Sequence, residues 1–164
     1  MKTLVWEREG LGRLIMIVVL QRCNSACVHI SGRLHTSIKK GLVLLLGIEK
    51  KDDEDDVNMI LKKILALRIF SDNDNKINHS IRDVDGSILL VSQFTLCADL
   101  KSGNRPGFTS AANSKKAEII YNYFIDQLKK EEIKYETGVF GASMNVSLIN
   151  DGPFTLILNS NMNL

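Results

Sequence analysis

The spacing of apolar residues along the chain predicts a protein built of strands with two helices. Stretches that alternate apolar and polar residues, or that stay apolar for the length of a strand, predict β-strands. These stretches are residues 16–22, 26–30, 33–38, 42–48, 88–94, 135–137, 143–149 and 154–158. The run from Leu42 to Ile48 contains no polar side chain, which favours a central strand buried on both faces.

Two other stretches show helical spacing. In the first, a charged block at residues 49–56 comes before apolar residues placed three or four positions apart, namely Val57, Ile60, Leu61, Ile64 and Leu65. We interpret the acidic residues of this block as a solvated first turn that complements the helix dipole, rather than as a metal site. The second helix is predicted to begin at Ser114, which can cap it. Its apolar stripe consists of Ala117, Tyr121, Phe124 and Leu128.

This order of elements predicts one α+β domain, with a curled, barrel-like sheet of mixed or antiparallel strands and two covering helices. A chain of 164 residues is long enough to bury a core without disulfide or metal staples. We assign the domain to residues 16–160. Residues 1–15 show no clean periodicity, and we treat them as an N-terminal extension whose status the sequence leaves open, with Met16 as an alternative start.

Composition changes this picture little. The hydrophobic share of 45% and the charged share of 24% are ordinary for a globular protein, and no segment has the length of a membrane span. A net charge of +2 does not indicate nucleic acid, although a local group of lysines and arginines can still contact phosphates. The cysteines Cys23, Cys27 and Cys97 lack CxxC spacing, so we expect free thiols and a cytoplasmic protein.

The sequence offers few residues for a conventional catalytic apparatus. His29, His35 and His79 have no metal-ligand spacing and no neighbouring nucleophile, so we expect no metal and no cofactor. Thr95 and Cys97 could act as nucleophiles, but each would need an activating base that the sequence does not identify. This scarcity favours catalysis by positioning, by backbone hydrogen bonds and by a reactive group that the substrate supplies.

Two short segments suggest a site built from backbone atoms. Asn150-Asp151-Gly152-Pro153 places a Gly-Pro pair between two strand-like runs, which predicts a sharp turn between them. Before proline the preference for a trans peptide is only about 0.5–1 kcal/mol, so this turn can hold a cis bond. Ser92-Gln93-Phe94-Thr95 ends a predicted strand and is the second such segment.

At these segments the chain resembles the D-aminoacyl-tRNA deacylase (D-tyrosyl-tRNA deacylase) family, whose members hydrolyse D-amino acids from mischarged tRNA. The resemblance runs from about residue 16 to residue 158. Its motifs are Gln21-Arg22, Leu67-Arg68-Ile69-Phe70, Ser92-Gln93-Phe94-Thr95-Leu96, Gly103-Asn104-Arg105-Pro106, Thr137-Gly138-Val139-Phe140-Gly141 and Asn150-Asp151-Gly152-Pro153. Each motif alone means little, and the combination is specific.

The resemblance implies a homodimer in which Gly152 and Pro153, joined by a cis bond, reach into the active site of the partner. Their carbonyls would bind the α-amino group of the substrate and leave no room for an L side chain, which is selection by steric rejection. The resemblance also implies that Arg22 holds this pair in position. A structural ion pair of Arg22 is the alternative.

For the pocket, the resemblance implies that Ser92, Gln93 and Phe94 line it and that their backbone meets the scissile ester. Thr95 is either a nucleophile or a bystander to a reaction assisted by the tRNA 2′-hydroxyl. Contacts to the terminal adenosine, including stacking on an aromatic ring, are implied for Ala117, Phe140 and Met144. For Phe140 and Met144 a role in ordinary core packing stays open.

We therefore expect hydrolysis of D-aminoacyl-tRNA, and also of glycyl-tRNA mischarged on tRNA-Ala, because glycine has no side chain to reject. Two alternatives remain. The first is a relaxed relative that removes L-alanine from a wrong tRNA. The second is a non-catalytic RNA-binding module that uses basic residues, namely Lys101, Arg105, Lys115 and Lys116. Turnover separates the enzyme from the binding module.

Overall fold

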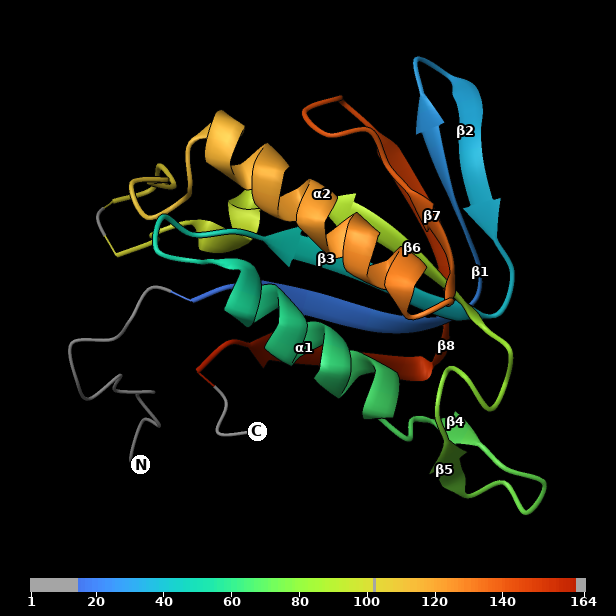
Figure 1. The fold of residues 1–164 in the computed structure, drawn as a ribbon. Coiled ribbons are helices and arrows are strands. Elements are labelled where there is room, and N and C mark those ends of the chain that lie inside the picture. The colour runs from blue at the N-terminus through green and yellow to red at the C-terminus, as the bar shows by residue number, and fades with distance from the viewer. Residues whose placement is uncertain (1–14, 102, 162–164) are drawn as a thin grey trace, which may run out of the picture.

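A computed structural model of the chain describes residues 15–101 and 103–161 (Figure 1). The predicted domain, residues 16–160, falls within this part apart from position 102. The predicted N-terminal extension lies outside the described residues, with Ile15 as the exception. No helix among the described residues is long and apolar enough to cross a membrane.

One mixed sheet of six strands forms the centre of the fold, in the order β2-β1-β3-β6-β7, with β8 paired to β1. The strands are β1 Ile17–Ile30, β2 Arg33–Ile38, β3 Gly41–Gly47, β6 Ser87–Ser92, β7 Lys134–Thr137 and β8 Asn145–Asn159. Pairing is antiparallel around β1 and parallel in β3–β6 and β6–β7. The sheet curls so far that its two ends meet, since Thr36 Oγ1 on β2 donates to Glu136 Oε2 on β7 at 2.5 Å. The predicted curled, barrel-like, mixed sheet is confirmed.

Two helices, α1 (Glu54–Ala66) and α2 (Ser114–Lys130), lie side by side over one face of the sheet (Figure 1). The acidic first turn of α1 is observed, and Asp53 and Asp56 form a reciprocal capping box there. The prediction that the charged block is solvated is wrong for Glu49, Asp52 and Asp56, which are buried; the Asp56 carboxylate turns back to accept from the Asp53 N–H. The cap of α2 differs from the prediction. Asn113 rather than Ser114 accepts from the Lys116 N–H at 2.9 Å, since a side chain must precede the first helical residue to reach that donor.

The core has two layers, one on each face of the sheet. Leu42, Leu44 and Leu46 of β3 pack with the apolar stripes of both helices, whereas Val43 packs on the opposite face with strand residues such as Val28. All five side chains are buried. This arrangement confirms a central strand buried on both faces, which runs from Gly41 to Gly47, one residue earlier at each end than predicted.

The strand predictions around β1 and β8 were wrong in one respect. Residues 16–22 and 26–30, apart from Met16, belong to one strand, β1, whose register shifts on both sides of Cys23 instead of breaking. Residues 143–149 and 154–158 likewise fall on the single strand β8, apart from the first two. Asn150 pairs with Cys23 and Thr155 pairs with Gln21, so residues 151–154 lie opposite Arg22 alone. The Gly-Pro pair therefore sits in a bulge of a continuous strand and not in a sharp turn between two strands.

Strand β6 ends at Ser92, two residues earlier than predicted, and the chain turns into the 3₁₀ helix η1 (Phe94–Cys97). Gly47 makes room for this turn, because a Cβ there would lie 2.9 Å from the Leu96 Cβ and 3.2 Å from the Gln93 carbonyl oxygen. A small hairpin of β4 (Phe70–Ser71) and β5 (Ile77–His79) was not predicted. Its strands are too short to show a two-residue period.

Candidate active site

A cavity of about 460 Å³ opens where β3 and β6 end, between the start of α2 and the segment 140–146. Because β3 and β6 are parallel, with Leu46 beside Ser92, their carboxyl ends meet at this edge of the sheet. The cavity brings together six residues predicted for the site, which are Ser92, Gln93, Phe94, Ala117, Phe140 and Met144. The structure therefore places these six residues around one cavity.

A backbone hydrogen bond fixes the segment of the cavity lining that contains Ser92, Gln93 and Phe94. The Gln93 N–H donates to the Leu46 carbonyl at 2.8 Å, which fixes the chain as it leaves β6. The Gln93 side chain turns along η1, where its Nε2 donates to Thr95 Oγ1 at 2.5 Å. Thr95 is exposed and lies beside the cavity without lining it, which differs from the other residues of this motif.

Phe140 contributes an aromatic ring to the cavity lining, and this ring packs against Tyr121. Its ring lies 5.6 Å from the ring of Tyr121, in a tilted arrangement. Tyr121 is buried, and its hydroxyl donates to the Leu90 carbonyl at 3.0 Å. Burial raises the pKa of the Tyr121 phenol above its usual value, so this hydroxyl stays a donor at neutral pH. Phe140 therefore packs against the core with one side and lines the cavity as well.

Met144 lies opposite a glycine that makes its position possible. A Cβ on Gly138 would lie 2.7 Å from the Met144 sulfur, so a larger residue there would displace the end of the Met144 side chain. The same sulfur accepts a weak hydrogen bond from the Val139 N–H at 3.4 Å. Ala117, on the first turns of α2, contributes only a methyl group and leaves the cavity open on that side.

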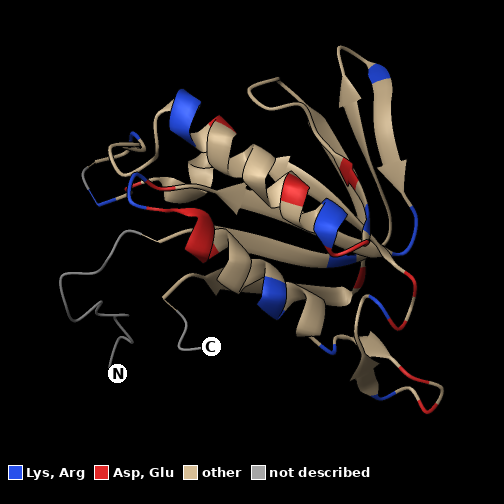
Figure 2. Ribbon diagram, in the orientation of Figure 1, with Lys and Arg blue, Asp and Glu red and all other residues tan. Residues whose placement is uncertain are grey.

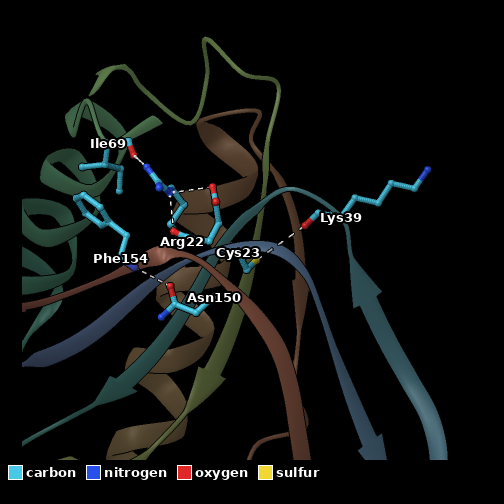
Figure 3. A network of polar contacts seen from close by, with 7 residues as sticks. Arg22, Cys23, Lys39, Ile69, Asn150 and Phe154 are labelled. Atoms are coloured by element: carbon cyan, nitrogen blue, oxygen red, sulfur yellow. Dashed lines mark hydrogen bonds and ion pairs between the residues drawn. The ribbon is translucent and has the colours of Figure 1, made fainter. Parts of the chain in front are cut away.

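Arg22 organises a second group of predicted residues around the bulge of β8 (Figure 3). It is buried, and its Nη1 donates to the Ile69 carbonyl at 2.6 Å. Its Nε donates to the Asp151 carbonyl at 3.0 Å and forms an ion pair with the Asp151 carboxylate at 3.1 Å. The guanidinium also lies 4.9 Å above the ring of Phe154. Arg22 thus contacts the residues on both sides of the Gly-Pro pair.

The Gly-Pro pair itself is exposed, and its peptide bond is cis, as expected. Gly152 has a φ of +135°, and a Cβ there would lie 3.0 Å from the Phe154 nitrogen and 3.1 Å from Arg22 Nη2. Glycine is therefore required at this position. Across the bulge, Asn150 Oδ1 accepts from the Phe154 N–H at 2.7 Å and fixes its width (Figure 3).

The two groups are separate within one chain. Arg22, Gly152 and Pro153 do not line the cavity, and neither does Thr95. Among the described residues, no group of three His, Cys, Asp or Glu side chains comes together as a metal site. Cys97 is a buried free thiol whose pKa is raised to about 12, first by burial and then by the carboxylates of Glu49 and Asp52. Such a thiol is a poor nucleophile, because the thiolate is the reactive form.

Sequence reasoning missed one aromatic residue of this region. Phe108 lies with its ring centroid 5.0 Å from that of Phe94, at an angle of 58°. Its signal in the sequence was an aromatic residue directly after Gly107 at the end of the basic loop. Contact with Phe94 depends on how that loop folds back, which the residue pattern does not specify.

Comparison with known proteins assigns the class. A family model described as D-Tyr-tRNA(Tyr) deacylase matches residues 19–159. The D-aminoacyl-tRNA deacylase of Thermosipho melanesiensis is 51% identical over 146 residues, which cover 88% of this chain and 97% of that protein. The D-aminoacyl-tRNA deacylase of Thermodesulfovibrio yellowstonii is 49% identical over 145 residues, with 88% and 99% covered.

Solved structures show the same fold. A structure titled c-Myc DNA Unwinding Element Binding Protein superimposes with a TM-score of 0.82 at 39% identity, covering 87% of this chain and 97% of that one. A probable eukaryotic D-amino acid tRNA deacylase superimposes with a TM-score of 0.76 at 15% identity, covering 88% and 99%, a likeness in fold alone. The chain belongs to the D-Tyr-tRNA(Tyr) deacylase family. It is a hydrolase of the D-aminoacyl-tRNA deacylase class, which confirms the resemblance seen in the sequence.

Proposed function

We propose that this protein hydrolyses the ester between a D-amino acid and the 3′ end of tRNA, and that a wall from the partner subunit of a homodimer selects the D form. The wall is the Gly152-Pro153 pair. The observation that carries this proposal is the exposed position of the pair, held by Arg22 and lying outside the cavity of its own chain. A second copy supplies the site to which such a wall belongs, and a two-fold axis creates two identical sites. Free cysteine thiols support a cytoplasmic location.

In this proposal the cavity receives the terminal adenosine. The Phe140 ring offers a face on which an unpaired base can stack. The Met144 thioether supplies a flexible apolar contact, and Ala117 leaves space for the nucleoside. Ser92, Gln93 and Phe94 then border the ester that joins the ribose to the amino acid.

Selection follows from the geometry of the α-carbon. The D and L forms differ by an exchange of the hydrogen atom and the side chain. Carbonyl oxygens of Gly152 and Pro153 accept hydrogen bonds from the α-amino group, and the wall fills the space that an L side chain requires. Glycine carries hydrogen at both positions, so the same wall admits glycyl-tRNA. Selection needs a rigid wall, and the contacts of Arg22 and Asn150 support that rigidity.

The chemistry needs no charged side chain. Water adds to the ester carbonyl carbon, the bond to the 3′ oxygen breaks, and that oxygen takes one proton of the water. The amino acid leaves as a carboxylate, and the second proton passes to solvent. We propose that the neighbouring 2′-hydroxyl of the tRNA orients the water, and that backbone N–H groups at the start of η1 stabilise the developing oxyanion. The contact of Thr95 Oγ1 with the Gln93 amide supports a secondary role for Thr95, because an amide N–H is a donor and not a base.

A mixed dimer tests the cross-subunit wall. Ala117→Trp fills the cavity of its own subunit and leaves its wall intact, whereas Gly152→Val displaces the wall and leaves the cavity intact. Each variant alone should be inactive on D-tyrosyl-tRNA. Dimers that contain one subunit of each, purified through two affinity tags, should regain one working site, or about half the wild-type activity.

Wild-type mixed with Ala117→Trp is the matched control for tag and assembly effects. A wall that served its own chain would leave the mixed dimer inactive, because one subunit would lack a cavity and the other a wall. That result, with all proteins folded and dimeric, would contradict the proposal.

A further inference from the structure

Two aromatic rings stand exposed at the edge of the cavity. Phe94 is 58% exposed and Phe108 is 38% exposed, and their ring centroids are 5.0 Å apart. Exposed apolar side chains that contact each other often mark a binding surface. Phe94 also lines the cavity, so this aromatic pair continues the proposed substrate cavity outward onto the surface.

The loop that carries Phe108 is closed at its base by hydrogen bonds. Asp99 and Gly107 exchange two backbone hydrogen bonds, at 2.7 and 2.9 Å. Ser110 Oγ donates to the Cys97 carbonyl at 2.7 Å, which ties the end of the loop to η1. These hydrogen bonds therefore fix the loop and the aromatic pair relative to η1, which directly follows Ser92 and Gln93 in the chain.

The tip of the loop is basic. Lys101 and Arg105 are exposed, and neither forms an ion pair with another described residue. The nearby Asp99 carboxylate accepts a hydrogen bond from the Lys101 backbone N–H at 2.9 Å. Figure 2 shows further Lys and Arg positions at this end of the molecule, at the first turn of α2. Both cations are therefore available to an anionic ligand.

Aromatic faces beside cations match single-stranded nucleic acid, in which bases stack on rings and phosphates pair with lysine and arginine. We propose that Phe94, Phe108, Lys101 and Arg105 bind the unpaired tRNA nucleotides that directly precede the terminal adenosine. This inference rests on the proposed function, because it takes aminoacyl-tRNA as the occupant of the adjacent cavity. By binding these nucleotides, the surface fixes the 3′ end of the tRNA and thereby places the ester beside Ser92, Gln93 and Phe94.

Two substrates separate this surface from the cavity itself. D-Tyrosyl-tRNA spans both, whereas the D-tyrosyl ester of adenosine reaches only the cavity. Phe108→Ala, and the double variant Lys101→Ala with Arg105→Ala, should each lower kcat/KM on the tRNA about tenfold, and leave the adenosine ester within about twofold of wild type. Phe108→Tyr, which keeps an aromatic face, should restore the tRNA activity.

Salt dependence supplies a second readout. For the double variant, the slope of log kcat/KM against log salt should become shallower by about 0.7 for each phosphate that the protein no longer neutralises. The double variant Lys62→Ala with Lys130→Ala, which removes two exposed lysines of the helices, is the charge-matched control and should keep the wild-type tRNA activity.

Equal reductions in activity on both substrates would show that Phe108 acts through the shape of the cavity and would overturn the inference. Wild-type activity of the loop variants on tRNA, or an equal reduction in the control, would overturn it as well. Inactivity of the wild type on both substrates would instead contradict the proposed function. In that case binding of uncharged tRNA decides the inference, which predicts about tenfold weaker binding for the loop variants than for the control.

Discussion

Asp52 is a fully buried carboxylic acid at the start of α1. Its Oδ2 accepts from the Glu49 N–H at 2.6 Å, while its Oδ1 has no hydrogen-bond partner among the described residues. The pKa of Asp52 is raised to about 7, mainly by burial and further by the carboxylates of Asp56 and Glu49. The Glu49 N–H and the Lys116 ammonium act in the opposite direction. The folded protein therefore holds a proton on Asp52 at pH values where the unfolded chain has released it.

This predicts a stability that depends on pH. Because the folded pKa lies above the unfolded value of 3.8, the free energy of unfolding should fall as pH rises from about 4 to about 7. Asp52→Asn keeps an acceptor for the Glu49 N–H and removes the titration. Its free energy of unfolding should vary less over this range and should exceed that of the wild type at pH 8, at about 1.4 kcal/mol per unit of pKa shift removed.

Urea unfolding at several pH values measures this difference, with Asp74→Asn in the exposed β4–β5 turn as the control. A wild type and an Asp52→Asn protein with the same pH slope would show that Asp52 does not hold a proton in the folded state.

At the scale of elements, the bulge of β8 opposite Arg22 is the feature to which the proposed function assigns selection. Replacing Arg22 with alanine removes the contacts to Asp151, Ile69 and Phe154 at once. The wall should then drift, and a displacement of about 1 Å can lower the rate on the order of a hundredfold. Arg22→Lys should recover only part of the activity, because an ammonium lacks the planar fork that reaches two carbonyls.

The measurement is kcat on D-tyrosyl-tRNA, made well below the melting temperature of each variant. The buried contact to the Ile69 carbonyl and the part-buried contact to the Asp151 carbonyl are both lost, so stability falls by about 1–3 kcal/mol. Arg82→Ala, which removes an exposed ion pair with Glu131, is the control. An Arg22→Ala enzyme that is folded and as fast as the wild type would remove Arg22 from the positioning role.

The helices and strands also show which parts of the fold the sequence could predict. Helical spacing predicted α1 and α2, and an uninterrupted apolar run predicted β3, because these patterns are local. Strands β1 and β8 were each predicted as two, since residues 23–25 and 150–153 have the composition of turns. In the structure each partner strand continues past these residues, and bulges absorb the extra ones. Strands β1 and β8 pair residues more than 100 positions apart, and a local sequence pattern does not predict such pairing.

The residues of the site likewise divide into those that the sequence predicted and those that it did not. The motifs identified Ser92, Gln93 and Phe94, and the cavity joins them to Phe140 and Met144 from the other end of the chain. Phe108 and the cap at Asn113 were missed, because their roles depend on how a loop folds back and on where a helix begins.

At the scale of the whole molecule, the fold places its cavity and its exposed Gly-Pro bulge on different parts of one body. The cavity lies at the start of α2, whereas the bulge lies midway along β8. Figure 1 shows where these two elements run. A single curled sheet, joined at its ends by Thr36 and Glu136, connects the two. We propose that a second copy related by a two-fold axis supplies each cavity with a wall, so that the proposed function belongs to the dimer and not to one chain.

The rate of deacylation of matched D- and L-tyrosyl-tRNA by the wild-type protein, with glycyl-tRNA as a third substrate, tests this account most directly. The wall predicts release of the D-amino acid at least a hundredfold faster than of the L form, a difference of about 2.7 kcal/mol in barrier height. Glycyl-tRNA should be cleaved, since it carries no side chain for the wall to exclude. Efficient cleavage of L-tyrosyl-tRNA by the same protein would contradict the account.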